Sequence, residues 1–183
     1  MDDSPDYLEK SPDAARMGKA AEYLVAAVCI LATRGQLNVS TSIVDDEGVD
    51  LVFHLRDHTA TLAVQVKARM LDGSVAAQGR IQASVRQATF KPRDSLDLLF
   101  ILVDNEHGII DTAWLVPSKD FDLMKGASTK RGRLRFAASA NPASRDMWSR
   151  EVPPEWWTGG QAAVAAAESD CSNEIGAIIP IDE

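Results

Sequence analysis

Apolar residues recur at helical spacing near the amino end of the chain. Between positions 17 and 32 they stand three or four residues apart, at Met17, Ala21, Leu24, Val25, Val28, Leu31 and Ala32. Such spacing places them on one face of an α-helix. Ser11 and Pro12 suit the N-cap and the first helical position, and Gly35 suits a helix stop. The pattern predicts one long helix with Glu22 at the edge of its buried face.

Beyond that helix the hydrophobic period changes to two, which is typical of half-buried strands. Residues 36–44 alternate apolar side chains with Ser, Thr and Asn. Two further apolar-rich runs, 48–55 and 60–67, are joined by the polar segment Arg56-Asp57-His58-Thr59. This arrangement predicts a strand followed by a β-hairpin.

The register of the hairpin can be derived if it folds symmetrically about its turn. Residues whose numbers sum to 115 then lie opposite one another, so Leu51 faces Val64 and Asp50 faces Gln65. Opposed Cβ atoms lie roughly 4.5 to 5.5 Å apart, and period-two alternation adds Lys67 to the same face. A carboxylate, an amide and an ammonium are expected to converge there. The alternative interpretation is a solvated sheet face without a chemical role.

The remaining elements complete an α/β pattern. Residues 71–94 have no clean period and accommodate one strand and a short helix, whereas 96–103 and 109–116 predict a second hairpin with a buried first strand. A short helix capped by Ser118 and an edge strand at 134–138 come next. The fold class expected is a mixed central sheet flanked by helices. Aromatic residues are expected to anchor the chain end on this body, namely Trp148, Trp156 and Trp157.

Composition divides the chain into a domain and two acidic ends. We expect an acidic extension at 1–10, one domain at 11–157 and a mobile tail rich in Gly, Ala and acids at 158–183. With 183 residues, 45% of them hydrophobic and 25% charged, the chain is long enough for one globular domain with its own core.

Cysteine usage and hydropathy indicate a cytoplasmic protein without a membrane segment. Cys29 and Cys171 lie far apart, with no CxxC pair and no Cys/His cluster, so neither a disulfide framework nor a structural zinc site is indicated. The longest apolar run, 20–32, contains Glu22 and is too short to cross a bilayer. No secretory signal is visible at the acidic amino end.

The charge distribution is more informative than the net charge of −8. Residues 1–15 carry −4 and residues 151–183 carry −7, which leaves +3 for the middle of the chain. Basic residues there form two groups: Lys125, Lys130, Arg131, Arg133 and Arg135, and Arg80, Arg86, Lys91 and Arg93. The middle could hold a polyanion while the ends stay away from it. Ordinary solvated loops account for the pattern equally well.

The ordered polar residues resemble the motifs of the PD-(D/E)XK nuclease superfamily. Three segments are similar to those of its QXK branches, which include Mrr-type restriction endonucleases and related uncharacterised bacterial families: Arg16-Met-Gly-Lys-Ala-Ala-Glu22, Glu47-Gly-Val-Asp-Leu-Val52 and Val64-Gln-Val-Lys67. The resemblance implies a restriction-endonuclease-like fold and a metal-dependent nuclease. It also implies DNA as the substrate and a role in defence or repair, and leaves a homodimer open.

The resemblance also assigns roles to individual residues. Asp50 would bind Mg²⁺ or Mn²⁺, with the side-chain oxygen of Gln65 and the backbone carbonyl of Val66 as further ligands. Glu22 would hold the ion through water. Lys67 would orient or deprotonate the attacking water. Because Gln65 stands where many members have a carboxylate, the site has one negative charge fewer and is expected to bind metal more weakly. The acidic triplet 45–47 either supplies the missing carboxylate or is only a turn, and we favour the turn.

Two other classes of function stay open at this point. One is a catalytically silent nuclease-like module that binds nucleic acid or a protein partner. The other is an inhibitor or immunity protein that uses its acidic ends as a decoy for a basic partner. The three histidines form no recognisable triad with a Ser or Cys, and no Gly-rich phosphate loop is present, which disfavours serine or cysteine hydrolases and NTPases. The three histidines are His54, His58 and His107.

Overall fold

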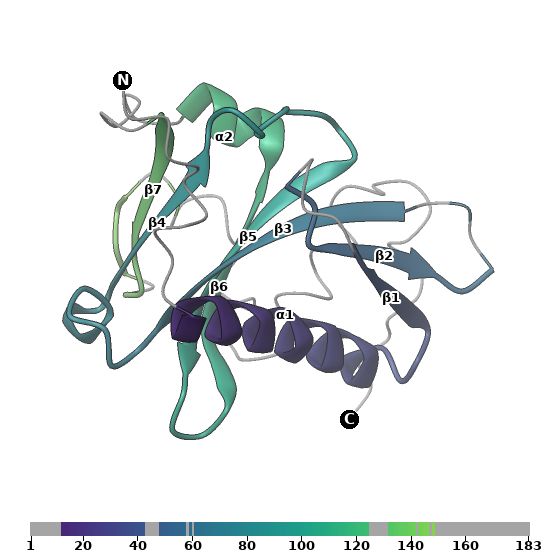
Figure 1. Ribbon diagram of the computed structural model, residues 1–183, viewed down its shortest axis with the longest axis horizontal. Helices are drawn as coiled ribbons and strands as arrows, with labels where there is room; N and C mark the ends of the chain where they lie inside the picture. Colours follow the sequence, from purple (N-terminus) through teal and green to yellow (C-terminus); the bar gives the residue numbers. More distant parts are fainter. Residues whose placement is uncertain are drawn as a thin grey trace.

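The computed structural model describes residues 12–42, 48–57, 59, 61–124, 132–141, 143–146 and 148. The segments 1–10 and 158–183, with Trp156 and Trp157, lie outside these residues, and so do the predicted N-cap Ser11 and the acidic triplet 45–47. Figure 1 shows the long helix α1 lying across one face of a central sheet, with strands β4 and β7 as a separate pair to one side.

The opening helix forms as its apolar spacing predicts. α1 spans Pro12–Ala32, and its fully buried residues Ala21, Val25 and Cys29 succeed one another at intervals of four, as on the inward stripe of an amphipathic helix. Glu22 lies next to this stripe with its side chain 15% exposed. Its predicted position at the edge of the buried face is therefore confirmed.

The central sheet is mixed, in the order β1-β2-β3-β5-β6. Only β3 and β5 run parallel, and the other neighbours are antiparallel. β5 lies inside the sheet and is buried along almost its whole length. The predicted fold class, a mixed sheet with helices, is confirmed. The strands are β1 (Leu37–Thr41), β2 (Leu51–Leu55), β3 (Thr61–Met70), β5 (Leu96–Asp104) and β6 (Ile109–Pro117).

The last strand belongs to a second sheet, which corrects the expectation of an edge strand. β7 (Arg133–Ser139) pairs antiparallel with β4 (Arg80–Arg86), and the two form a ribbon of their own. Phe136 of β7 stacks on Phe100 of β5, with ring centroids 3.8 Å apart and an interplanar angle of 3°. Burial of this aromatic side chain draws β7 over the face of the central sheet instead of along its edge.

Short elements complete this second layer. The segment after β3 forms the 3-10 helix η2 (Ala76–Gln78) before β4, in line with the short helix and single strand expected there. Trp148 is buried, and its ring lies 5.0 Å from that of Phe136, so this tryptophan anchors the chain as predicted.

The second α-helix, α2, spans Ser118–Met124, and the cap predicted for it needs a correction. The buried hydroxyl of Ser118 donates to the carbonyl of Arg93 at 2.8 Å and accepts from its amide at 2.9 Å. The serine thus joins α2 to the chain before β5.

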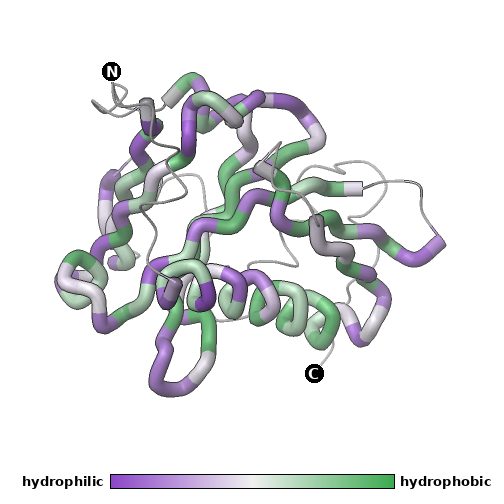
Figure 2. The backbone as a smooth tube through the Cα atoms, in the orientation of Figure 1, coloured by the Kyte–Doolittle hydropathy of each residue, from purple (hydrophilic) through white to green (hydrophobic). Residues whose placement is uncertain are grey.

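Two apolar cores lie on the two faces of the central sheet. Val64 and Val66 of β3 pack with α1 on one face, whereas Leu98 and Phe100 of β5 pack with the β4–β7 ribbon on the other. In Figure 2 the first turns of α1 mix polar and apolar residues, whereas its last turns are mostly apolar. Among the described residues, no helix combines the length and apolarity that crossing a membrane requires.

Candidate functional site

The hairpin of β2 and β3 has the register predicted from the sequence, and it opens at the candidate site. Paired residues run from His54 with Thr61 to Leu51 with Val64. β2 begins at Leu51, whereas β3 continues to Met70 in parallel pairing with β5. The two strands therefore diverge beside Asp50.

Asp50 spans this point of divergence. Its amide donates to the carbonyl of Val64 at 3.0 Å, and the amide of Val66 donates to its Oδ2 at 2.7 Å. Gln65 stands between the two contacts, so Asp50 lies beside it as predicted. The carboxylate thus accepts the hydrogen bond that a backbone carbonyl of β2 would accept from Val66 if the strand pairing continued. Because the amide and carbonyl of one strand residue point to the same side, the carbonyl of Val66 also points toward the side of Asp50.

The amide of Gln65 packs against the backbone of Gly48. Gly48 has a φ of +70°, and a Cβ atom built there would lie 2.5 Å from Nε2 of Gln65 but 3.8 Å from its Oε1. Gln65 itself is only 7% exposed. A residue without a side chain is thus required next to the amide nitrogen.

The geometry differs from the expectation that all site residues share one face of the sheet. Val64 and Val66 face α1, so strand alternation turns Gln65 and Lys67 to the opposite face. Glu22 belongs to α1 and lies on the helix side. A common site for these residues can form only around the end of β2, where the sheet opens at Asp50.

Lys19 of α1 forms an ion pair with Glu22, a role that the sequence analysis did not assign. Its Nζ donates to Oε2 of Glu22 at 2.6 Å. This hydrogen bond is the main cause that raises the pKa of Lys19, against the opposing effect of burial, and the negative charges of Glu22 and Asp50 raise it further. The i, i+3 spacing of Lys19 and Glu22 is the signal that could have indicated the pair.

Lys67 lies on the far side of β3 from α1. It is half-buried and stands in register with Phe100 of β5. It therefore lies on the face of the sheet that packs against the β4–β7 ribbon. Arg69 comes two residues later on the same face. The sequence analysis gave Arg69 no role. Its spacing of two and four residues from Lys67 and Gln65 already predicts that the three side chains lie on the same face of β3.

The residues predicted to hold a metal carry oxygen atoms of the kind that suits a hard cation. Two carboxylates, an amide oxygen and a backbone carbonyl are the oxygen ligands that Mg²⁺ takes. The negative charges of Glu22 and Asp50 stabilise the ammonium of Lys19, so a positive charge is favoured close to Glu22. Within the part of the chain that the structure describes, no group of three or more His, Cys, Asp or Glu could hold a metal ion.

Comparison of the sequence with models of known protein families gives no match, and comparison with curated proteins gives none either. Among solved structures, the fold is similar to that of a bacterial homing endonuclease, I-Ssp6803I. The two chains are 15% identical, the TM-score is 0.49, and the alignment covers 90% of this chain and 97% of the other. A similarity at this level concerns the overall arrangement and identifies no functional residue.

Proposed function

We propose that the protein is a nuclease that hydrolyses phosphodiester bonds of DNA with the help of Mg²⁺ or Mn²⁺. The observation that carries the proposal is the hydrogen bond from Val66 to Asp50, which fixes a carboxylate beside Gln65 at the opening between β2 and β3. Strand divergence there ends the backbone pairing of β3 with β2 at Val64, so that the carboxylate of Asp50 contacts the β3 backbone at Val66.

In this proposal some of the residues bind the metal ion, and Lys67 acts on the attacking water and the phosphate. Asp50, the oxygen of Gln65 and the carbonyl of Val66 would hold the ion, and Glu22 would hold it through water. A bound divalent cation supplies positive charge that lowers the pKa of a water and offsets charge at the phosphate. Lys67 would orient or deprotonate the attacking water and add a second positive charge at the phosphate.

A second candidate is a nucleic-acid-binding module that has lost catalysis. The observation that favours it is the amide of Gln65 at a position where a carboxylate would bind metal more strongly. Lys19 adds to this argument, because its ammonium already compensates the charge of Glu22. Such a module would bind nucleic acid equally well with and without divalent cations.

Cleavage assays separate the two candidates. We would incubate the purified chain with supercoiled plasmid, single-stranded DNA and RNA, in Mg²⁺, in Mn²⁺ and in EDTA. The nuclease proposal expects plasmid cleavage with either metal and none in EDTA. Replacing Lys67 by Ala should reduce the rate by about 10²-fold or more, since it removes a charge that stabilises the transition state.

The matched control is Lys119→Ala. Lys119 is an exposed lysine whose ammonium contacts Asp94, and it lies on α2, outside the candidate site. Cleavage should persist in this variant. Equal cleavage by the Lys67→Ala protein would identify a contaminant or another site and would remove the basis of the proposal.

A further inference from the structure

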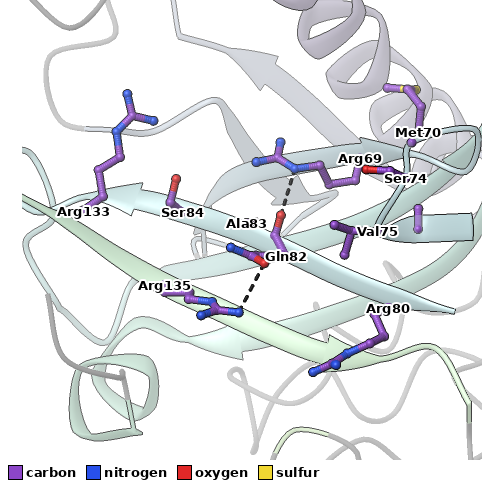
Figure 3. A pocket seen from close by; sticks show the side chains of 12 residues that line it. Arg69, Met70, Ser74, Val75, Arg80, Gln82, Ala83, Ser84, Arg133 and Arg135 are labelled. Carbon is purple, nitrogen blue, oxygen red and sulfur yellow. Dashed lines mark hydrogen bonds between the residues drawn. The ribbon is translucent and has the colours of Figure 1, made fainter. Parts of the chain in front are cut away.

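A groove rich in arginine lies at the end of β3, the strand that carries Gln65 and Lys67. It has a volume of about 430 Å³ and is formed by the end of β3, the loop before η2 and the β4–β7 ribbon. Among the described residues that form its walls there is no Asp, no Glu and no aromatic residue. Four guanidinium groups line it, from Arg69, Arg80, Arg133 and Arg135 (Figure 3).

The fold of the ribbon brings these charges together from two distant parts of the sequence. β4 and β7 pair with Ser84 opposite Arg135 and Arg86 opposite Arg133. The alternate residues of both strands are buried in the aromatic core, for example Ile81 and Phe136. Strand alternation therefore turns the arginines of β4 and β7 to the outer face of the ribbon.

Hydrogen bonds hold two of the guanidinium groups in place. Nε of Arg69 donates to the carbonyl of Gln82 at 2.9 Å, and Nη2 of Arg135 donates to the side-chain oxygen of the same residue at 3.2 Å (Figure 3). Anchored side chains lose less entropy when they bind a ligand. Burial is the main cause that lowers the pKa of Arg69, and repulsion from Arg133 lowers it further. An anionic ligand would relieve this repulsion.

We propose that the arginine groove binds the sugar-phosphate backbone of double-helical nucleic acid. The chemistry fits phosphate, because guanidinium groups bind phosphate oxygens through paired hydrogen bonds. Proteins that bind single strands stack bases on aromatic side chains, and the groove walls offer none. A duplex needs no such platform, since its backbone is held through its phosphates.

The groove reaches β3 at Arg69 and Met70, just beyond Lys67 on the same strand. Lys67 and Arg69 share a face and are two residues apart, which corresponds to about 7 Å along a strand. A backbone held at Arg69 therefore passes close to Lys67. The inference extends the proposed nuclease by naming the duplex as its ligand, and duplex binding depends on that proposal only for the cleavage step that comes after it.

Binding measured in EDTA tests the groove without cleavage. The fluorescence anisotropy of a labelled duplex would be monitored at several salt concentrations for the full chain and for Arg80→Gln/Arg135→Gln. The duplex affinity should fall about tenfold or more, and the slope of log K against log salt should decrease by about 0.9 for each arginine removed. The matched control, Arg34→Gln/Arg56→Gln, removes the same charge at the exposed far end of α1 and of β2.

The results of the binding and cleavage assays distinguish failure of the duplex-binding inference from failure of the nuclease proposal. Unchanged binding in the groove variant, an equal loss in the control, or single strands bound as tightly as the duplex would overturn the inference. Groove-dependent binding without cleavage in Mg²⁺ would support the groove and contradict the nuclease. Cleavage that is insensitive to the groove variant would do the reverse. Thermal unfolding of each variant confirms that these exposed substitutions leave the fold intact.

Discussion

The amide of Val66 and the carboxylate of Asp50 are joined by a hydrogen bond of 2.7 Å. The bond gives Asp50 a structural task in addition to any task in metal binding. It satisfies a backbone donor at the place where β2 no longer pairs with β3. Stability depends on the acceptor oxygen of this side chain, whereas the proposed metal binding would depend on its charge.

Replacing Asp50 by Asn or by Ala separates these properties. Asn keeps an acceptor oxygen for the amide of Val66, so its free energy of unfolding should stay within about 1 kcal/mol of the wild type. Ala leaves that donor unsatisfied and should cost about 1–3 kcal/mol. Both variants should lose Mn²⁺-linked thermal stabilisation and cleavage. Urea unfolding and thermal shifts with and without Mn²⁺ measure this, and a metal-linked shift retained in Asp50→Asn would contradict the assignment.

Gly48→Ala is expected to displace the Gln65 amide. The new Cβ would meet Nε2 at 2.5 Å, and the far end of a flexible side chain is the part that can move away. The positive φ adds a backbone cost of about 1–2 kcal/mol. We expect Mn²⁺ affinity, measured by calorimetric titration, to fall together with stability.

Gly108→Ala is the matched control for the backbone term. Gly108 has a φ of +67°, and a Cβ there would meet nothing within 4 Å. It should lose a similar amount of stability while keeping its metal affinity. If the two alanine variants bound Mn²⁺ equally well, the contact between Gly48 and Gln65 would have no part in the metal site.

Lys19→Ala should strengthen metal binding. The ammonium of Lys19 donates to Glu22 and interacts with the charge of Asp50, so it competes with a divalent cation for the same field. The Mn²⁺ dissociation constant, measured without nucleic acid, should decrease. Arg16→Ala is the control, because its exposed pair with Asp13 lies one turn earlier on α1. A weaker affinity in Lys19→Ala would show instead that the lysine helps to build the site.

Cys29 should make the protein less stable at high pH. Burial raises the pKa of its thiol from 9.0 to about 12, so the folded chain keeps the proton between these values while the unfolded chain loses it. The unfolded state is thereby favoured, and stability falls by about 1.4 kcal/mol per pH unit in this window. Below pH 9 the contribution vanishes.

Comparison with Cys29→Ala isolates this effect. Cys171 and all other titrating groups are the same in both proteins, so the difference in unfolding free energy should narrow as the pH rises above about 9. Urea unfolding at several pH values measures it. A difference that stays constant with pH would mean that the thiol ionises in the folded protein as it does in the unfolded chain.

The sequence by itself determined the local elements and the register of the hairpin. The spacing of Ala21 and Val25 specifies a helical stripe, and the alternation around Leu51 and Val64 allows one pairing that buries the apolar face, because a shift by one residue would turn it to water. Asp50 therefore came to lie beside Gln65 as expected. The helix and the hairpin register depend on residues that are close in the sequence, so the hydrophobic periodicity predicts them.

Only the tertiary structure decided how distant elements meet. Periodicity shows that Phe136 is buried but not against which strand, so the stacking on Phe100 and the ribbon of β4 and β7 could not be foreseen. The same holds for the effect of the Asp50 charge on Lys19 and for Arg69 in one groove with Arg135. Burial and charge fix which residues need partners, whereas the choice of partner depends on packing between segments that the sequence keeps far apart.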